Sequence, residues 1–319
     1  MKVSVLVPVY RVEPFIEECA VSLFEQSYKD IEYIFVDDCS PDKSIEVLEE
    51  VINRYPDRER QVRIIQNNKN RGSGATRSIA LAAATGNFIL FVDSDDVITT
   101  DAVEKLCRQQ EKTNVDIVDG AFCRLSSTGL NTPVYPYHGM SSDMLCLILA
   151  KNTLTHNVWA RLIRKSLFDR HHIDFVEGIN LAEDYSIMSM LIFYATRSFI
   201  NDIIYHYRIN NSGTFASGLS RKNVNSFLDA NTLVGNFLAE NDLKDALRFP
   251  YELGMLQTYH SAFQIGLSRK EIDKRCHYRP RIPLFRCLHT LFCHRCLRQL
   301  LYAVYLVVKR IYKQSHYQK

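Results

Sequence analysis

The sequence Asn87-Phe-Ile-Leu-Phe-Val-Asp-Ser-Asp-Asp96 decides the fold that we expect for this chain. Its five consecutive apolar residues are typical of a parallel β-strand buried on both faces, and three carboxylates follow at once. Open α/β sheets bind their ligands at the carboxyl ends of such strands. Acids this close repel one another, so the pattern favours a divalent cation held by oxygen ligands, Mg²⁺ or Mn²⁺. The alternative is a solvated loop in which Asp95 or Asp96 caps the next helix.

Strand and helix patterns alternate on both sides of this stretch. Strands are expected at 2–7, 31–36, 62–65, 88–92, 116–118 and 199–207, and helices from Ile16, from an N-cap at Ser40, and over 72–85, 102–112 and 181–195. The first strand is expected to stop at Pro8. From about residue 221 the pattern is helical, with breaks expected at Pro250, Pro280 and Pro283. This order predicts an α/β fold with a mostly parallel sheet and a helical C-terminal region.

The composition is that of a folded protein. Of 319 residues, 46% are hydrophobic and 24% are charged, which argues against disorder. Nine cysteines without disulfide-scaffold spacing, and a start without an apolar signal peptide, predict a cytoplasmic location. The longest apolar run near the end, 300–308, is too short to span a bilayer.

The end of the chain is strongly basic. After Asp273 there are eleven Lys and Arg residues and no Asp or Glu. Basic residues interleaved with leucines predict a helix lying on an anionic membrane surface, with an ordinary packed helix as the alternative. Nucleic acid is not an expected partner, because the rest of the chain is acidic and carries no nucleic-acid motif. Thiols and imidazoles in this segment would suit zinc, although apolar packing is the favoured interpretation: Cys287, His289, Cys293, His294 and Cys296.

Five short motifs carry a resemblance to a known family. Val7-Pro-Val-Tyr10, Val36-Asp-Asp-Cys-Ser-Pro-Asp42, the segment 70–77 and Val92-Asp-Ser-Asp-Asp96 are similar, in order and spacing, to the signatures of the family 2 glycosyltransferases. Ala182-Glu-Asp-Tyr185 resembles the catalytic-base motif of that family. The resemblance implies the GT-A fold, a nucleotide-diphosphate sugar donor, a divalent metal and inversion at the anomeric carbon. It fades after about residue 215.

Two residues depart from the family pattern: Arg11 stands where Asn is common, and Cys39 where Gly is common. Both departures bear only on the local shape of their loops. We expect a glycosyltransferase domain over 1–215, with a nucleotide-sugar half at 1–97 and an acceptor half at 98–215. A helical region would follow over 216–319.

The donor-site residues follow from the motifs. Tyr10 offers a flat surface to a uracil-type base and Asp38 an acceptor for its ring N–H, with Asp37 orienting them. The alternatives are an ordinary strand-end aromatic and an Asx-turn. Arg77 would reach the base or diphosphate, or else form a structural ion pair with the acid cluster. The full nucleotide-sugar set is Pro8, Tyr10, Glu13, Asp37, Asp38, Arg77, Asp93 and Ser94.

Acidic residues are also predicted to bind the metal and to act as the general base. Asp95, with Asp93, would bind the metal, and His206 would complete that site. An acceptor hydroxyl needs a general base, a role assigned to Asp184 ahead of Glu183. The alternative is that both acids only favour a helix N-terminus.

Three residues are predicted to lie on the acceptor side. They are Trp159, Glu183 and Arg208, the last with Ser212 and Thr214 as further phosphate ligands. A lone Trp is more often a core residue, and a His in a strand more often a structural one.

The expected activity is transfer of a sugar, from a UDP-sugar in the first instance, to a glycan or lipid-linked hydroxyl on the inner face of the cell membrane. Two alternatives stay open. One is a sugar nucleotidyltransferase of similar fold, which the missing Gly-rich loop after the first strand disfavours. The other is a catalytically silent scaffold that binds a membrane or nucleic acid.

Overall fold

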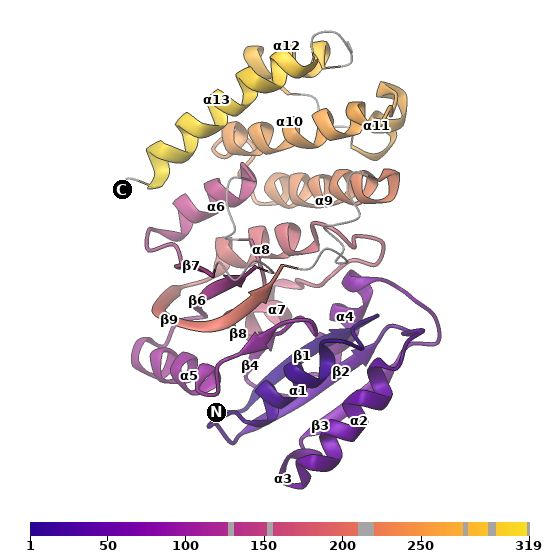
Figure 1. The fold of residues 1–319 in the computed structure, drawn as a ribbon. Coiled ribbons are helices and arrows are strands. Elements are labelled where there is room, and N and C mark those ends of the chain that lie inside the picture. Colours follow the sequence, from indigo (N-terminus) through magenta and orange to yellow (C-terminus); the bar gives the residue numbers. More distant parts are fainter. Residues whose placement is uncertain (127–130, 152–155, 210–219, 277–279, 293–297, 318–319) are drawn as a thin grey trace. The chain divides into compact units, whose positions relative to one another are not determined.

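The computed structural model describes residues 1–126, 131–151, 156–209, 220–276, 280–292 and 298–317 (Figure 1). The chain divides into two compact units. The sheet unit comprises Met1–His138, Val158–Gly178 and Tyr194–Ala216, and the helical unit comprises Gly139–Asn157, Ile179–Phe193 and Ser217–Lys319. The units interleave along the sequence, whereas the sequence predicts one boundary near residue 215.

The first four strands of the sheet unit are parallel, as the sequence predicts. They are β1 (Val3–Val9), β2 (Ile31–Asp37), β3 (Val62–Gln66) and β4 (Phe88–Phe91), in the order β3-β2-β1-β4. The expectation that β1 stops at Pro8 is wrong, because Pro8 pairs with Val36 inside the strand. The register with β4 covers only the first four residues of β1, up to Leu6. The N–H that Pro8 lacks would point towards β4 beyond that ladder, so no sheet hydrogen bond is lost.

Helices cover the parallel strands. These are α1 (Ile16–Phe24), α2 (Ser44–Arg54), the short α3 (Pro56–Glu59) and α4 (Ser73–Ala83). Apolar residues of α1 and α2 form one core with every second residue of β1, among them Val3, Val5 and Val7. The expected N-cap at Ser40 is wrong: α2 begins at Ser44, and the Ser40 hydroxyl instead accepts a hydrogen bond from the Arg11 N–H.

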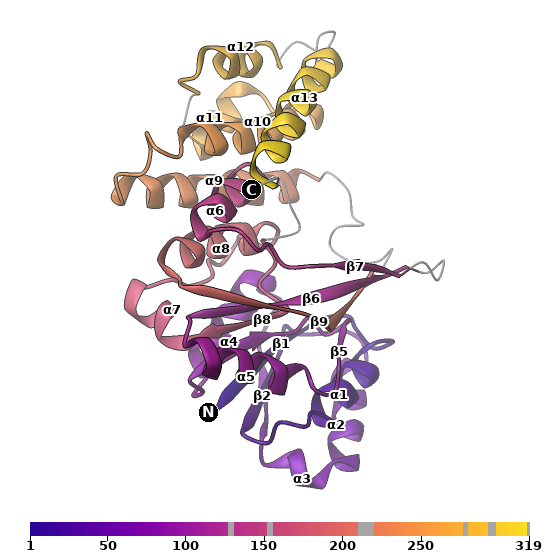
Figure 2. The same cartoon turned by 90° about the vertical axis from the view of Figure 1, so that its left-hand side faces the viewer.

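The second half of the sheet is mixed rather than parallel. It contains β5 (Val97–Ile98), β6 (Ile117–Leu125), β7 (Thr132–Val134), β8 (Arg161–Arg164) and β9 (Arg197–Arg208), together with α5 (Ala102–Thr113) and α7 (Lys165–His171). The order continues β4-β8-β6-β9-β5, with β8 antiparallel to both of its neighbours (Figure 2). The parallel expectation therefore holds for the first four strands, and the rest completes a mixed α/β sheet.

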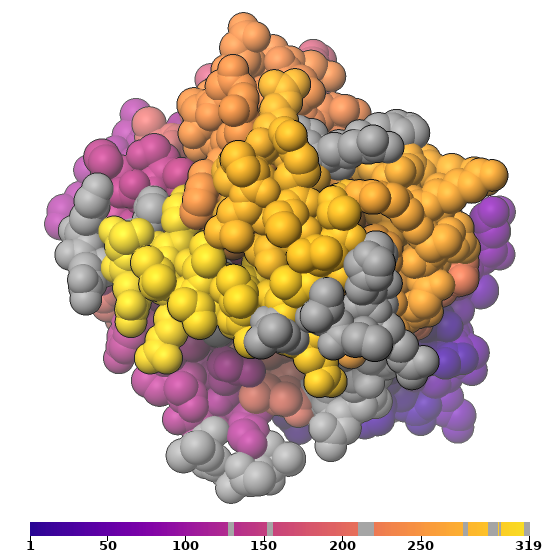
Figure 3. All heavy atoms as spheres, turned by 90° about the horizontal axis from the view of Figure 1, so that it is seen from above, coloured from indigo at the N-terminus to yellow at the C-terminus, as the bar shows by residue number. Residues whose placement is uncertain are grey.

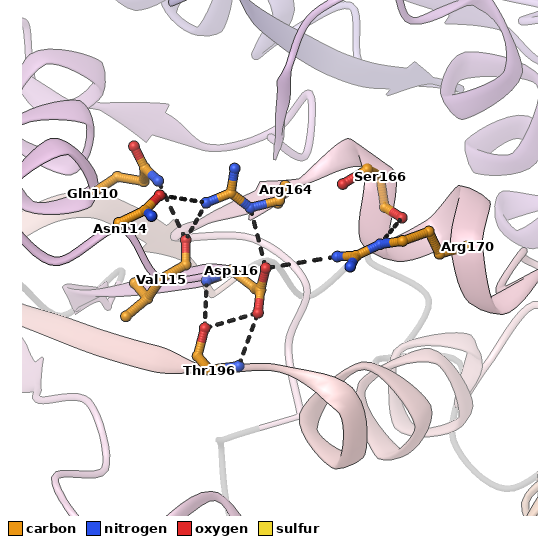
Figure 4. Close-up of polar contacts among 8 residues, drawn as sticks. All are labelled: Gln110, Asn114, Val115, Asp116, Arg164, Ser166, Arg170 and Thr196. Atoms are coloured by element: carbon orange, nitrogen blue, oxygen red, sulfur yellow. Dashed lines mark hydrogen bonds and ion pairs between the residues drawn. The ribbon is translucent and has the colours of Figure 1, made fainter.

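A polar network joins three of these strands at one end (Figure 4). Asp116, just before β6, accepts hydrogen bonds from the Thr196 N–H at 3.1 Å and the Thr196 hydroxyl at 2.7 Å. It also accepts one from Arg164 Nε at 3.1 Å, at the end of β8. Partial burial would raise the pKa of Asp116, but the hydrogen bonds from Thr196 and the charge of Arg164 lower it below its ordinary value. The carboxylate thus ties β6, β8 and β9 together.

The helical unit is a set of packed helices. They are α6 (Ser141–Leu149), α8 (Glu183–Tyr194), α9 (Arg221–Glu240), α10 (Arg248–Gln264), α11 (Arg269–Arg275), α12 (Pro283–Leu291) and α13 (Arg298–Tyr317). All residues of α8 from 185 to 192 are buried. Gly254 of α10 lies against the Leu149 carbonyl, where a Cβ would clash. The close approach of α6 and α10 therefore depends on this glycine.

Two of the three expected proline breaks hold. Pro280 lies between α11 and α12, and Pro283 is the first residue of α12. The break expected at Pro250 is wrong, because Pro250 lies in the first turn of α10, where a missing N–H costs no helical bond. In the described ranges, none of the helices is long and apolar enough to cross a bilayer.

Candidate active site

The loops that follow β1 and β2 are held together by hydrogen bonds. The Arg11 N–H donates to Ser40 Oγ at 3.1 Å, and the Glu13 N–H donates to Asp42 Oδ2 at 3.2 Å. In return, Glu13 Oε2 accepts from the Lys43 N–H at 3.0 Å. Glu13, predicted as a nucleotide ligand, therefore joins the loop after β1 to the loop after β2.

Arg11 and Cys39, the two residues that depart from the family pattern, both have left-handed backbone conformations. Arg11 has φ 55° and Cys39 has φ 59°. Asn and Gly, the residues common at these positions, are those that tolerate this region best. Arg11 and Cys39 each bear a cost of about 1–2 kcal/mol there. The loop geometry expected of the family is thus retained with less suitable residues.

Asp38 is buried and organises the loop before α4. Its carboxylate accepts from the N–H groups of Arg71 at 2.8 Å and Gly72 at 2.7 Å, and from Asn67 Nδ2 at 2.8 Å. A carboxylate offers about four acceptor positions, so one is left for a ligand donor. The neighbouring Asp37 accepts from the Ser40 N–H at 2.8 Å, so it fixes the turn rather than pointing to a ligand.

The ring of Tyr10 is half-exposed, with 39% of its surface accessible, and the Arg11 guanidinium lies 5.3 Å from its centroid. Pro8 lies within β1, and Ser94 is buried between the acids that follow β4. An open depression of about 720 Å³ lies beside Glu13. Its lining residues are Arg11, Glu13, Pro14, Glu17, Pro41, Asp42 and Val47, so the acids after β4 are not part of it.

Arg77 and Asp93 form an ion pair. Arg77 Nη2 lies 2.6 Å from Asp93 Oδ1, and the two side chains are 7% and 24% exposed. This is the structural ion pair that the sequence leaves open as the alternative for Arg77. It anchors α4 to the end of β4 and offsets one of the charges there.

Asp96 is the member of the acid run that sequence reasoning missed. It is 1% exposed and accepts hydrogen bonds at 2.7 Å from the Tyr205 hydroxyl and the Arg208 N–H. Burial, followed by the charges of Asp95 and Asp93, raises the pKa of Asp96 to about 9. The Tyr205 hydroxyl also accepts from the Asp93 N–H at 3.1 Å. Tyr205 and Asp96 therefore hold the acid loop against β9.

The donor set fits a cation shared with a substrate. In the described ranges no three His, Cys, Asp or Glu side chains form a metal cage. Asp95 and Asp93 offer hard oxygen ligands, and Mg²⁺ is commonly held by one or two carboxylates plus substrate phosphates. After burial, the charges of Asp95 and Asp93 raise the pKa of Asp96 further, as expected of carboxylates that lie close together.

His206 faces away from this cluster. Successive residues of a strand point to opposite faces, and Tyr205 and Tyr207 are the ones whose pKa values are raised by burial and then by Asp96 and Asp93. Burial alone lowers the pKa of His206. Its Nδ1 is buried and has no hydrogen-bond partner within the described residues. A metal-ligand role for His206 gains no support.

The predicted acceptor-side residues of the sheet unit are occupied by structural contacts. Trp159 is 8% exposed and stacks on Tyr205 at 4.6 Å and Tyr207 at 5.2 Å between centroids. Arg208 donates to Glu18 Oε2 at 2.6 Å. Ser212 and Thr214 lie outside the described residues.

The candidate base lies in the helical unit. Glu183 and Asp184 form the first turn of α8, directly after Ala182, whose φ of 78° is strained for a residue with a Cβ. Ser226 of α9 holds the preceding loop: its hydroxyl accepts from the N–H groups at 180 and 181, both at 3.0 Å, and donates to the carbonyl at 181 at 2.7 Å. Ser226 of α9 thus fixes the loop that leads into the first turn of α8.

The thiol and imidazole cluster is only partly described. Cys287 is exposed, and His289 is buried with its Nδ1 3.0 Å from Arg269 Nη2. The remaining members, Cys293, His294 and Cys296, lie outside the described residues.

A parallel β3-β2-β1-β4 sheet with acids at its carboxyl ends, extended by a mixed half, defines the GT-A class of α/β proteins. Residues 4–191 match the family model for glycosyl transferase family 2, and the chain belongs to that family.

Known proteins agree. This chain is 30% identical to the putative glycosyltransferase EpsH of Bacillus subtilis over 259 residues, 75% of this chain and 73% of EpsH. It is 35% identical to the uncharacterized glycosyltransferase EpsJ of the same species over 194 residues, 57% of this chain and about half (53%) of EpsJ. The fold resembles that of S. aureus TarS 1–349 in complex with UDP-GlcNAc, with a TM-score of 0.63 at 20% identity over 99% of this chain and 92% of TarS 1–349.

Proposed function

We propose that this chain is an inverting glycosyltransferase that moves a sugar from a UDP-sugar to a hydroxyl of a glycan or lipid-linked acceptor, in polysaccharide or glycoconjugate synthesis. The observation that carries the proposal is the acid run 93–96 after β4, in a chain of glycosyl transferase family 2. TarS, of similar fold, was determined with UDP-GlcNAc, which supports a UDP-sugar as donor.

The donor would bind along the loops that follow the parallel strands. The exposed Tyr10 ring offers a stacking surface, and the spare acceptor position of Asp38 suits a base N–H. Arg77 is engaged with Asp93, so its proposed part is to hold that carboxylate in place and to balance its charge.

A divalent cation fits Asp95 with Asp93. When bound, Mg²⁺ or Mn²⁺ would stabilise the charge that develops on the leaving diphosphate. Asp96 and Tyr205 would keep the loop that carries these acids in position.

The general base in this proposal is Asp184. An acceptor hydroxyl is a weak nucleophile at neutral pH, and a carboxylate that takes its proton speeds the attack. One base and one cation suit a direct displacement, in which the hydroxyl forms the new bond as the diphosphate leaves, inverting the anomeric carbon. Glu183, buried beside it, is the second choice.

A peripheral position on the inner face of the membrane completes the proposal. Val304, Val307 and Ile311 of α13 are 40%, 59% and 61% exposed and recur at helical spacing. Arg310 and Lys313 of the same helix are exposed as well. Figure 3 shows the C-terminal residues, in yellow, at the surface. An apolar stripe beside cations, in a segment without acids, suits anionic lipid.

Incubation of the purified protein with a panel of nucleotide sugars, with and without a chelator, tests the donor and the metal together. We expect slow hydrolysis of one UDP-sugar that stops with chelator and in Asp95→Ala. UDP binding that neither chelator nor this substitution weakens would refute the metal-dependent site.

A further inference from the structure

Lys151, just after α6 in the helical unit, combines features that cost free energy. Its φ of 51° is left-handed although it is not a glycine. Its amine is enclosed, although the residue as a whole keeps some exposed surface. No carboxylate in the described part of the chain forms an ion pair with it, and none of the remaining residues is an Asp or Glu. Burial, and then the charge of Lys309, lower the pKa of Lys151 to about 7.

The contacts of the amine lead to α8. Lys151 Nζ donates a hydrogen bond to Thr258 Oγ1 at 2.6 Å. It lies 4.8 Å from the ring centroid of Tyr185 and 5.3 Å from that of Phe227, both within cation–π range. Tyr185 is buried, belongs to the first turn of α8 and directly follows Asp184.

Stability does not account for a lysine at this position. Replacing a buried charge by an apolar side chain of similar volume is often neutral or stabilising, because the desolvation cost disappears. An amine packed against an aromatic ring, and charged below about pH 7, does, however, favour one placement of that ring. Ser226 already fixes the loop before α8. The Tyr185 ring belongs to the first turn itself, and it is there that the Lys151 amine contacts α8.

We propose that Lys151 is a positioning residue, which acts through the ring of Tyr185 to hold the turn that carries Glu183 and Asp184. The inference rests on the proposed role of Asp184 as general base. Lys151, just after α6, would help to position that base, although Lys151 itself touches no reacting atom.

The test compares Lys151→Met with Lys309→Met in the full chain. Lys309 is the comparison residue, because its pKa is also lowered by burial, to about 8, and its amine lies over the ring of Tyr305 rather than Tyr185. Its amine donates to the Lys151 carbonyl at 2.8 Å, so Lys309→Met removes a contact to the Lys151 backbone while the Lys151 amine keeps its place over Tyr185. Lys151→Met is expected to lower kcat by about 10- to 100-fold, the scale of a small misplacement of a reacting group. KM for the donor and UDP affinity should stay unchanged, and the thermal midpoint should hold or rise. Lys309→Met should keep its kcat.

Two further variants separate the ring contact from general packing. Lys151→Arg keeps a cation over the ring and should restore most of the lost kcat. Tyr185→Leu should lower kcat as Lys151→Met does, and the double variant should lower it no further, because both remove one contact. Hydrogen–deuterium exchange over 180–190, which needs no activity, should be faster in Lys151→Met and unchanged in Lys309→Met.

The outcomes distinguish this inference from the proposed function. If Asp184→Asn abolishes transfer while Lys151→Met retains full kcat and unchanged exchange over 180–190, the positioning role is refuted and the base assignment stands. If Asp184→Asn retains transfer, the base assignment fails, and the exchange data alone decide whether Lys151 holds the turn. Equal losses of kcat and UDP affinity in Lys151→Met would also overturn the inference.

Discussion

The two units treat buried charge differently. In the sheet unit Asp119 lies between two arginines: Arg161 Nη1 donates to it at 2.6 Å and Arg197 Nε at 3.0 Å, and all three side chains are at most 7% exposed. In the helical unit the Lys151 amine meets a hydroxyl and two rings. Opposite charges that are paired this closely secure architecture, whereas a buried charge without an acid gives up stability. The comparison indicates that the paired charges of Asp119 stabilise the sheet unit, whereas Lys151 lies in the helical unit without an acid to stabilise its charge.

The largest effect expected from the helical unit is on turnover. Asp184→Asn preserves the shape of the side chain and removes its basicity, so we expect turnover to fall by about 10²–10⁴-fold. Donor binding and the thermal midpoint should stay near those of the parent chain. The measurement is steady-state transfer alongside UDP calorimetry, with Glu183→Gln as the matched control. Near-normal transfer by Asp184→Asn, with collapse in Glu183→Gln, would move the role one residue upstream.

The largest effect expected from the sheet unit is on stability. Asp119→Ala leaves Arg161 and Arg197 buried without their shared acid, so we expect a loss of about 3–5 kcal/mol in the free energy of unfolding. Urea unfolding followed by the fluorescence of Trp159, the one Trp of the chain, which lies in the sheet unit, measures it. The exposed pair of Arg54 and Glu17 serves as the control, since Glu17→Ala should cost less than about 1 kcal/mol. Equal losses in the free energy of unfolding for Asp119→Ala and Glu17→Ala would show that the buried charges of the sheet unit do not stabilise it.

Nucleotide binding should respond to Asp38 on a smaller scale. Asp38→Ala removes one acceptor for the base and three for the loop before α4, so UDP affinity should fall by about 1–3 kcal/mol. Calorimetry measures it, and circular dichroism checks the fold. Unchanged affinity in a folded variant would show that Asp38 serves the loop alone.

Sequence reasoning succeeds for the parallel strands because long apolar runs specify them locally. The strands β5 and β8 are too short for a periodic signal, at two and four residues, and their pairing is set by the sheet that they join. The same limit applies at the site. The acids after β4 are visible in the sequence, but the hydrogen bond from Tyr205 to Asp96 joins residues 109 positions apart.

Some left-handed backbone conformations can be predicted from the sequence and others cannot. The left-handed positions of Arg11 and Cys39 are signalled by the Asn and Gly common there in the family. Those of Lys151 and Ala182 have no such signal, because neither residue favours that conformation. They become visible only when the packing around α8 is known.

The pH dependence of stability sharpens the contrast between the units. The pKa of Lys151 is lowered by burial and then by Lys309, and the Cys276 thiol acts the other way, while Thr258, Tyr185 and Phe227 are uncharged. Between about pH 7 and the ordinary value near 10.4 the unfolded chain binds a proton that the folded chain does not. Stability should therefore rise with pH across this window, by at most about 1.4 kcal/mol per pH unit.

Urea unfolding of the full chain between pH 7 and 8, followed by circular dichroism, tests this contribution. Lys151→Met should flatten the rise in that interval. Lys309→Met should keep a rise but shift it to higher pH, because removing the Lys309 charge raises the pKa of Lys151. Identical profiles for the parent and Lys151→Met would show that the amine is solvated.

The smallest effect concerns α13 and anionic vesicles. Each well-placed basic residue contributes about 1 kcal/mol to binding at such a surface. Arg310→Glu and Lys313→Glu, both on exposed positions of α13, should together weaken sedimentation with anionic vesicles and leave transfer to a soluble acceptor unchanged. Arg108→Glu, on α5 of the sheet unit, is the matched charge reversal at an exposed site and should leave vesicle binding intact. Higher salt should weaken binding of the parent chain, because exposed charges are screened. If all these proteins sediment equally, α13 does not form the membrane-binding surface; if only the variants with reversed charges on α13 stay in solution, the cations of α13 attach the chain to the vesicle.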